Sequence, residues 1–205
     1  YSAVSFVILY NTNVVTYREL PTGWDSLLEP RWKGRVAVPD PLKSDMAASV
    51  LTEAAKNSEK EEFLDLLAEN MQYQMPETFK EVEQGISDGR YSIGVTSEEA
   101  AKAMLAAGQD VDYIDPEEGE CFFEDGTAIR KRTPNLDASE AFVTYPTCDD
   151  TKWLLRTQLL RQPAEDVAAE NDRSDEDLKQ RYSRQQEVLN IWKLIMEEKS
   201  GSAHE

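Results

Sequence analysis

Short runs of β-branched and aromatic residues alternate in this chain with longer segments of helical periodicity, and this alternation constrains the fold more than any other feature. The runs are too short for helices and are closed by turn residues, which is typical of buried strands. They lie at residues 5–10 (SFVILY), 35–38 (RVAV), 91–95 (YSIGV), 111–114 (VDYI) and 120–123 (ECFF). Strands separated by helices predict an α/β fold with a parallel or mixed sheet and helices on both faces.

The predicted helices follow from apolar residues at helical spacing, several of them behind a good capping residue. They span residues 46–54, 58–70, 76–88, 98–107, 138–145, 150–160 and 175–198. The last helix has the clearest apolar side, formed by Leu178, Tyr182, Val188, Leu189, Ile191, Trp192 and Ile195. Residues 127–130 are expected to be extended. Residues 161–174 are polar and contain a proline, which predicts the most mobile stretch of the chain.

Composition excludes two classes of partner. The chain has 205 residues, of which 40% are apolar, so it can fill a real core. It carries 22 basic and 40 acidic residues, and the resulting net charge of -18 would repel a nucleic-acid backbone or an anionic membrane surface. Most of this acidity falls on predicted helix faces, where charge is usually a solvated coat.

Catalytic and metal-binding chemistry finds little support. The only histidine is His204, and the sequence has no G-x-S-x-G elbow, P-loop or G-x-G-x-x-G motif. We therefore expect no enzyme, no resident metal and no cofactor. Cys121 and Cys148 are either two free thiols or one bridge. Residues 1–9 are apolar without a basic region before them, so we expect a strand rather than a signal peptide, in a piece of a longer protein.

Two segments can bind a ligand, because ligands of open α/β sheets lie at the carboxyl ends of strands, beside helix N-termini. Ser44, Asp45 and Met46 enter a helix after the second strand, and Thr96, Ser97 and Glu98 enter one after the third. Two such termini in one cleft suit an anionic group. The same residues are also ordinary caps, and the carboxylates of Glu98 and Glu99 suit an ammonium group or a cation instead. The sign of the ligand's charge stays open.

Longer motifs carry a family resemblance. The segments YNT (10–12) and LPTGWDSLLEPRWKGRVAV (20–38) resemble a stretch shared by iron(III), thiamine, phosphonate and sugar-phosphate binding proteins. IGVTSE (93–98), YIDPEEG (113–119) and DGTAI (125–129) resemble later elements of that family, as do Asn135, Ala138, Phe142 and Tyr145. The chain is thus similar to the extracytoplasmic solute-binding proteins of ABC importers, which have the type 2 periplasmic binding-protein fold.

The resemblance implies a division of the chain. Residues 1–12 would form a hinge strand, residues 13–115 the second lobe, and residues 116–205 the return hinge and C-terminal helices that pack on a first lobe. Family members carry a long stretch before the YNT strand that forms most of the first lobe, and it is absent here. The face left open would then favour a homo-oligomer.

The resemblance also implies a function. Ser44-Asp45-Met46 stands at the family's S-G-(A/T) turn, and Glu98 and Glu99 stand at the tyrosine pair of the iron-binding branch. Branches with glutamate at the first of these positions bind phosphorylated or phosphonate-bearing organics. We therefore expect a periplasmic or extracellular protein, membrane-anchored or free, that captures a small polar, anionic solute by hinge closure and delivers it to an ABC permease. A sensory domain of a signalling receptor and a cation- or iron-binding member are the alternatives.

Overall fold

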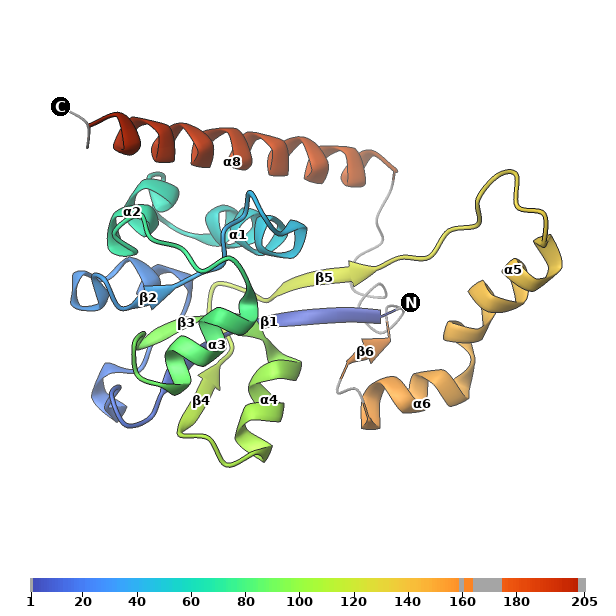
Figure 1. Ribbon diagram of the computed structural model, residues 1–205, viewed down its shortest axis with the longest axis horizontal. Coiled ribbons are helices and arrows are strands. Elements are labelled where there is room, and N and C mark those ends of the chain that lie inside the picture. The colour runs from blue at the N-terminus through green and yellow to red at the C-terminus, as the bar shows by residue number, and fades with distance from the viewer. Residues whose placement is uncertain (1, 159–160, 164–174, 203–205) are drawn as a thin grey trace.

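One long strand, β1 (Ser2–Asn11), runs through the middle of the sheet and pairs with four of the other five strands that the structure describes (Figure 1). The computed structural model describes residues 2–158, 161–163 and 175–202. The remaining strands are β2 (Val36–Ala37), β3 (Ile93–Ser97), β4 (Val111–Ile114), β5 (Cys121–Asp125) and β6 (Gln162–Pro163). β2 is parallel to β3, whereas β3, β4, β5 and β6 are antiparallel to β1, so the predicted mixed sheet is confirmed.

The register of β1 shows how the strands share its two edges. Phe6 pairs with Ser97 of β3 and with Cys121 of β5. Because a strand residue has only two edges, β3 and β5 lie on opposite sides of β1. By the same reasoning β4 shares the edge of β5, and β6 shares the edge of β3. Each edge of β1 is therefore used twice, once by each half of the strand.

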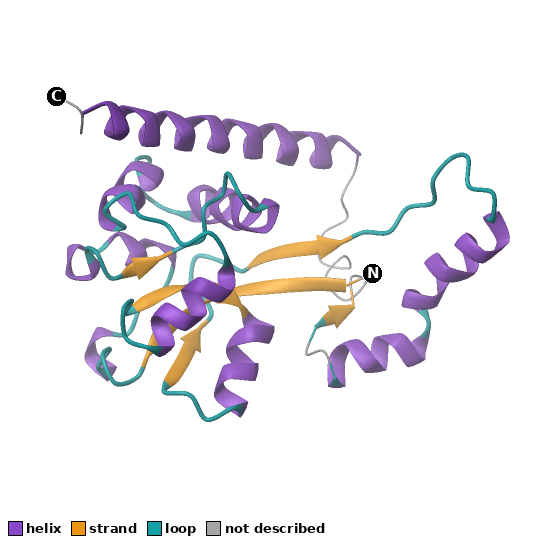
Figure 2. Ribbon diagram, viewed as in Figure 1, coloured by secondary structure: helices purple, strands orange, loops and turns teal. Residues whose placement is uncertain are grey.

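Helices cover both faces of this sheet, as the sequence predicts (Figure 2). One face carries α1 (Asp45–Asn57), α2 (Phe63–Asn70) and α8 (Asp175–Ser202). The other carries α3 (Phe79–Ser87) and α4 (Glu98–Ala106). Short 3-10 turns, η1 (Tyr17–Glu19), η2 (Trp24–Leu28) and η3 (Pro30–Trp32), lie between β1 and β2. α5 (Leu136–Thr144), η4 (Tyr145–Thr147) and α6 (Asp149–Thr157) form an arm that extends away from the sheet.

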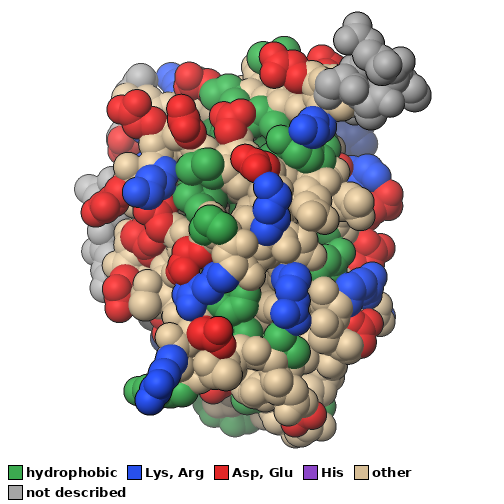
Figure 3. Space-filling view, turned by 90° about the vertical axis from the view of Figure 1, so that its left-hand side faces the viewer, with side chains coloured by type: hydrophobic (Ala, Val, Ile, Leu, Met, Phe, Trp, Pro, Cys, Tyr) green, Lys and Arg blue, Asp and Glu red, His purple; other side chains and the backbone are tan. Residues whose placement is uncertain are grey.

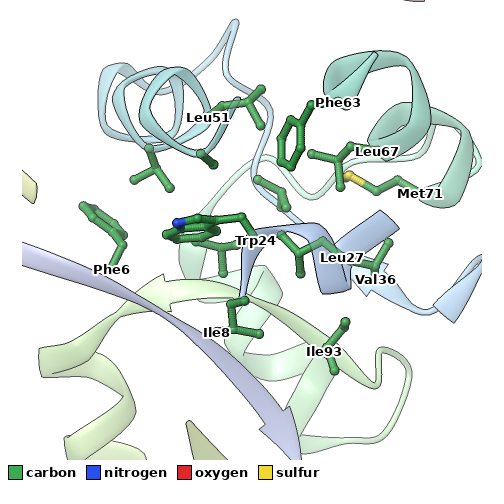
Figure 4. Close-up of a cluster of buried hydrophobic side chains, with 14 of the residues drawn as sticks. Phe6, Ile8, Trp24, Leu27, Val36, Leu51, Phe63, Leu67, Met71 and Ile93 are labelled. Atoms are coloured by element: carbon green, nitrogen blue, oxygen red, sulfur yellow. The ribbon is translucent and has the colours of Figure 1, made fainter. Parts of the chain in front are cut away.

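The alternating side chains of β1 supply both cores, which explains its unbroken apolar run. Phe6 and Ile8 face the larger core, under α1, α2 and α8, whereas Val7 and Leu9 face α3 and α4. Trp24 is fully buried in the larger core. Figure 4 shows it between the helix side chains Leu51 and Phe63 and the strand side chains Ile8 and Ile93. Packing on both faces fixes the register of β1, because a shift by one residue would exchange the two sets of side chains.

Some predicted boundaries differ from the structure. α2 begins at Phe63 rather than at residue 58, because Ser58 ends α1: its backbone N–H donates to Ala54 O. Residues 126–130 form a loop, and the short strand β6 was not predicted. Most of the segment predicted to be mobile, residues 164–174, lies outside the described residues.

The C-terminal helix differs from expectation in two ways. Val188 and Trp192 are buried against α1 and α2, but Tyr182 and Ile191 are exposed, because a straight helix buries only a narrow stripe. α8 therefore packs on α1 and α2, whereas the resemblance implies that the C-terminal helices would pack on a first lobe. α5 and α6 also leave large apolar side chains exposed, namely Leu136, Phe142, Trp153 and Leu154.

On the face shown in Figure 3, acidic and basic side chains are interspersed between small apolar areas. This arrangement agrees with a solvated coat. None of the helices in the described residues is long and apolar enough to cross a membrane.

The two cysteines are separate free thiols, which resolves the alternative left open by the sequence. Cys121 is buried, and its Sγ lies 3.9 Å from Val50 O. Burial raises the pKa of the Cys121 thiol. Cys148 lies before α6, where the hydrogen bond of its thiol with Thr151 lowers its pKa.

The close approach of α3 to β3 gives a first test. A Cβ built on Gly94 would lie 2.6 Å from Ala37 O and 2.9 Å from Val82 Cγ1. Gly94→Ala should therefore lower the free energy of unfolding by about 1–3 kcal/mol, as overpacking does. Gly126→Ala is the control, because nothing lies within 4 Å of its added Cβ. Urea unfolding of both variants measures the difference, and equal stabilities would contradict this packing.

Thiol labelling gives a second test. With a thiol-specific reagent in native buffer, one thiol per chain should react quickly, and Cys148→Ser should abolish that fast phase. Cys121 should react only when the protein unfolds, because it is buried and its pKa is raised. Two fast thiols, or none in either protein, would contradict the placement of the cysteines.

Candidate functional site

The N-terminus of α1 follows β2, as the sequence predicts. Ser44 is its N-cap, and its Oγ accepts a hydrogen bond from Ala47 N at 3.2 Å. Asp45 is exposed, and Met46 packs partly against the larger core. Ser44 is a hydrogen-bond acceptor for the Ala47 amide, one of those that a helix leaves without an internal acceptor. The amides of Asp45 and Met46, which lie between Ser44 and Ala47, can therefore meet a ligand.

The N-terminus of α4 has the same form with a charged first turn. Ser97 is the N-cap, and its Oγ accepts from Ala100 N at 3.1 Å. The Glu98 carboxylate accepts a hydrogen bond from Ser5 Oγ at 3.1 Å and pairs with Lys102 Nζ at 2.6 Å. The hydrogen bond to Glu98 raises the pKa of Lys102. Glu98 thus has a cationic partner on its own helix, which offsets its charge.

Thr96 lies below this surface and not on it. It is fully buried, and its Oγ1 donates to Glu83 Oε1 of α3 at 2.7 Å. Burial raises the pKa of Glu83, and the hydrogen bond from Thr96 opposes that rise. Thr96 therefore joins α3 to the sheet, and the structure does not bring its hydroxyl to the surface that carries Ser97.

A third helix N-terminus lies beside the other two and was not predicted as part of a site. Thr78 caps α3, accepting from Glu81 N at 3.2 Å. The spacing T-x-x-E of Thr78 and Glu81 is a capping-box pattern and is the sequence signal that would have indicated it. Asp40 N donates to Pro76 O at 2.9 Å, and Lys43 pairs with Glu77. These contacts join the loop before α1 to the start of α3.

The N-termini of α3 and α4 meet at Phe6 of β1, and the loop before α1 is joined to the start of α3. The Phe6 ring stacks against Phe79, the first residue of α3, with centroids 5.4 Å apart. Phe6 also pairs with Ser97, the N-cap of α4, and with Cys121, which contacts Val50 of α1. We call this surface the edge site: Ser44–Met46, Thr78–Phe79 and Ser97–Glu98. Helix N-termini and cap hydroxyls gathered at one sheet edge can bind a small polar group, and an anion best.

Two other features bear on binding. A groove of about 670 Å³ lies between α3 and α4, lined by Lys80, Glu83, Gln84, Ser87, Asp88, Arg90, Met104 and Gln109. It lies along the outer helices and does not include the predicted site residues. No group of three or more metal-ligating side chains gathers within the described residues.

Known proteins share this fold. A periplasmic binding protein of Actinobacillus pleuropneumoniae, AfuA, solved with fructose-6-phosphate bound, is 16% identical with a TM-score of 0.76 over 96% of this chain and 67% of its own. An ABC transporter structure from Clostridium perfringens is 20% identical, with a TM-score of 0.64 over 96% of this chain and 68% of its own. A two-component system protein that mediates signal transduction is 20% identical, with a TM-score of 0.70 over 87% of this chain and 60% of its own.

These comparisons also show how much of a related protein's length the chain spans. It spans 60% of the length of the two-component system protein and 51% of a second periplasmic binding protein. No curated protein matches the sequence. The family model described as "Bacterial extracellular solute-binding protein" matches residues 1–186, which is most of the chain. The chain therefore belongs to the bacterial extracellular solute-binding protein family.

Proposed function

We propose that this chain is the greater part of the solute-binding component of an ABC importer. The observation that carries the proposal is the meeting of three helix N-termini at one sheet edge, in a chain of a solute-binding family. In this proposal the protein captures a small polar solute, closes around it without covalent chemistry, and delivers it to a permease.

The proposed division of the chain follows its course through the sheet. Residues 1–12 form the hinge strand, and residues 13–115 form the second lobe. Residues 116–205 contain the return hinge and the C-terminal helical part. Of the helices in that part, α5 and α6 meet a first lobe in this proposal, whereas α8 stays with α1 and α2.

The proposed solute is anionic, with a phosphate or phosphonate group. Three N-termini present partial positive charge, and Lys102 offsets the carboxylate of Glu98. Binding of fructose-6-phosphate by AfuA, a protein with this fold, is consistent with such a solute. Glu98 would instead attract a cationic solute if its pair with Lys102 opened, so its replacement distinguishes the two signs.

The sign of the solute's charge can be tested by replacing Glu98. A thermal-shift screen against phosphorylated sugars, phosphonates, polyamines, thiamine and metal ions first selects a compound, since a ligand stabilises the state that binds it. Calorimetric titration then compares Glu98→Gln with the unaltered chain. For an anion, loss of the carboxylate should lower the dissociation constant by roughly tenfold, the scale of one partly screened charge.

The matched control is Glu59→Gln, which removes the same charge from an exposed position beyond the C-terminal end of α1. It should leave the dissociation constant unchanged. A dissociation constant that rises in Glu98→Gln would contradict the anionic solute. A screen without any stabilising compound would contradict binding by this chain.

A second candidate function is solute sensing. The two-component system protein with the same fold favours it, because such a domain can report a solute to a signalling partner. Co-purification from membranes separates the two functions. An importer component should retain permease subunits, whereas a sensor domain should retain a signalling partner.

The arm of α5 and α6 predicts self-association of the chain. Phe142 and Trp153 are 69% and 58% exposed, as expected for a face that a first lobe covers. Without that cover we expect oligomers in light scattering at micromolar concentration, and Phe142→Ser with Trp153→Ser should shift them to monomer. Tyr17→Ser is the control, because Tyr17 is 89% exposed on a separate 3-10 turn. A chain that is monomeric throughout would contradict the prediction.

A further inference from the structure

Arg161 joins segments of the chain that lie far apart in the sequence. Its Nε donates to Glu99 Oε2 in the first turn of α4, and its Nη1 donates to Asp125 Oδ2 at the end of β5, each at 2.7 Å. The same Asp125 oxygen accepts from Ser2 Oγ of β1 at 2.6 Å. The Arg161 side chain is 28% exposed, so both ion pairs are partly shielded from water.

The topology explains why this contact forms beside the edge site. Along one edge of β1, β3 ends where Ser97 pairs with Phe6, and β6 begins to pair at Ala3. α4 leaves the sheet between these two points, and its first turn therefore lies next to the residue that precedes β6. Ser5, on the β1 segment between them, binds Glu98 of the same turn.

We propose that Arg161 is a positioning residue of the edge site, which fixes the first turn of α4 relative to β5 and β6. Glu99 follows Glu98 directly, so a displacement of β5 or β6 reaches the turn that carries Ser97 and Glu98. The consequence for solute binding rests on the proposed function, but the mechanical link does not. In hinge closure, this link would couple movement of β5 and β6 to the geometry of the edge site.

The chemistry of arginine suits this role. A planar guanidinium presents several N–H donors in a fixed arrangement and can hold two carboxylates at once, which a single ammonium group does less well. Removal of Arg161 would also leave two partly buried carboxylates, Glu99 and Asp125, without this cation. Arg161→Lys should therefore restore only part of the effect of the native residue.

Amide hydrogen exchange followed by mass spectrometry tests the link without any ligand. In Arg161→Gln, exchange should rise roughly tenfold or more at residues 98–101 and 121–125, as expected for loss of charged hydrogen bonds. Residues 79–87 should keep their native rates. Arg132→Gln is the matched control, because it removes the same charge from an exposed loop position. Equal exchange in the two variants, or a uniform rise over the chain, would overturn the proposal.

A double-mutant cycle separates a specific link from general loosening. Glu99→Gln alone should speed exchange at residues 98–101, but should add little in the Arg161→Gln background, because the pair is already broken. Fully additive effects would overturn the link. Once a solute is identified, Arg161→Gln should weaken its binding several-fold and Arg132→Gln should not. Unchanged binding in a chain with altered exchange would overturn the positioning role while leaving the proposed function intact.

Discussion

The rest of the structure depends on hydrogen bonding along both edges of β1. β3 and β6 pair with one edge, and β4 and β5 with the other. Both faces of the strand are also buried, so β1 determines where each helix can pack. The loop between β4 and β5 is held in addition by Glu118, whose carboxylate accepts from Trp24 N and Asp25 N at 2.9 and 3.0 Å. This loop is thus fixed to the larger core through η2, which carries the buried Trp24.

The position of the edge site follows from that arrangement. Because β2 and β3 are parallel, their carboxyl ends meet at one edge, and α1, α3 and α4 begin there. Phe6 lies at the centre of this edge, and Arg161 lies where β3 gives way to β6. Membership of an extracellular family confirms the predicted periplasmic or extracellular location.

Much of the fold could be predicted, because strand periodicity and helix caps are local signals. The predicted caps were Ser44 or Asp45 before one helix and Thr96-Ser97 before another, and Ser44 and Ser97 are the residues that cap them. A hydroxyl before a helical pattern is a signal that needs no tertiary information. Thr96 could not be placed, because its orientation depends on the pleat of β3 and on Glu83 of another helix. The contacts of Arg161 were not predicted, because its partners are 62 and 36 residues away and no local pattern joins them.

Nuclear magnetic resonance of the ¹⁵N-labelled chain, titrated with a phosphorylated sugar, tests the central claim most directly. The account predicts that the amide shifts which change with saturation belong to residues 45–47, 79–81 and 97–100, around Phe6. Saturable changes centred on Ser87, Arg90 and Gln109, which line the groove between α3 and α4, would contradict the edge site. A spectrum that does not change with any phosphorylated sugar would also contradict the edge site.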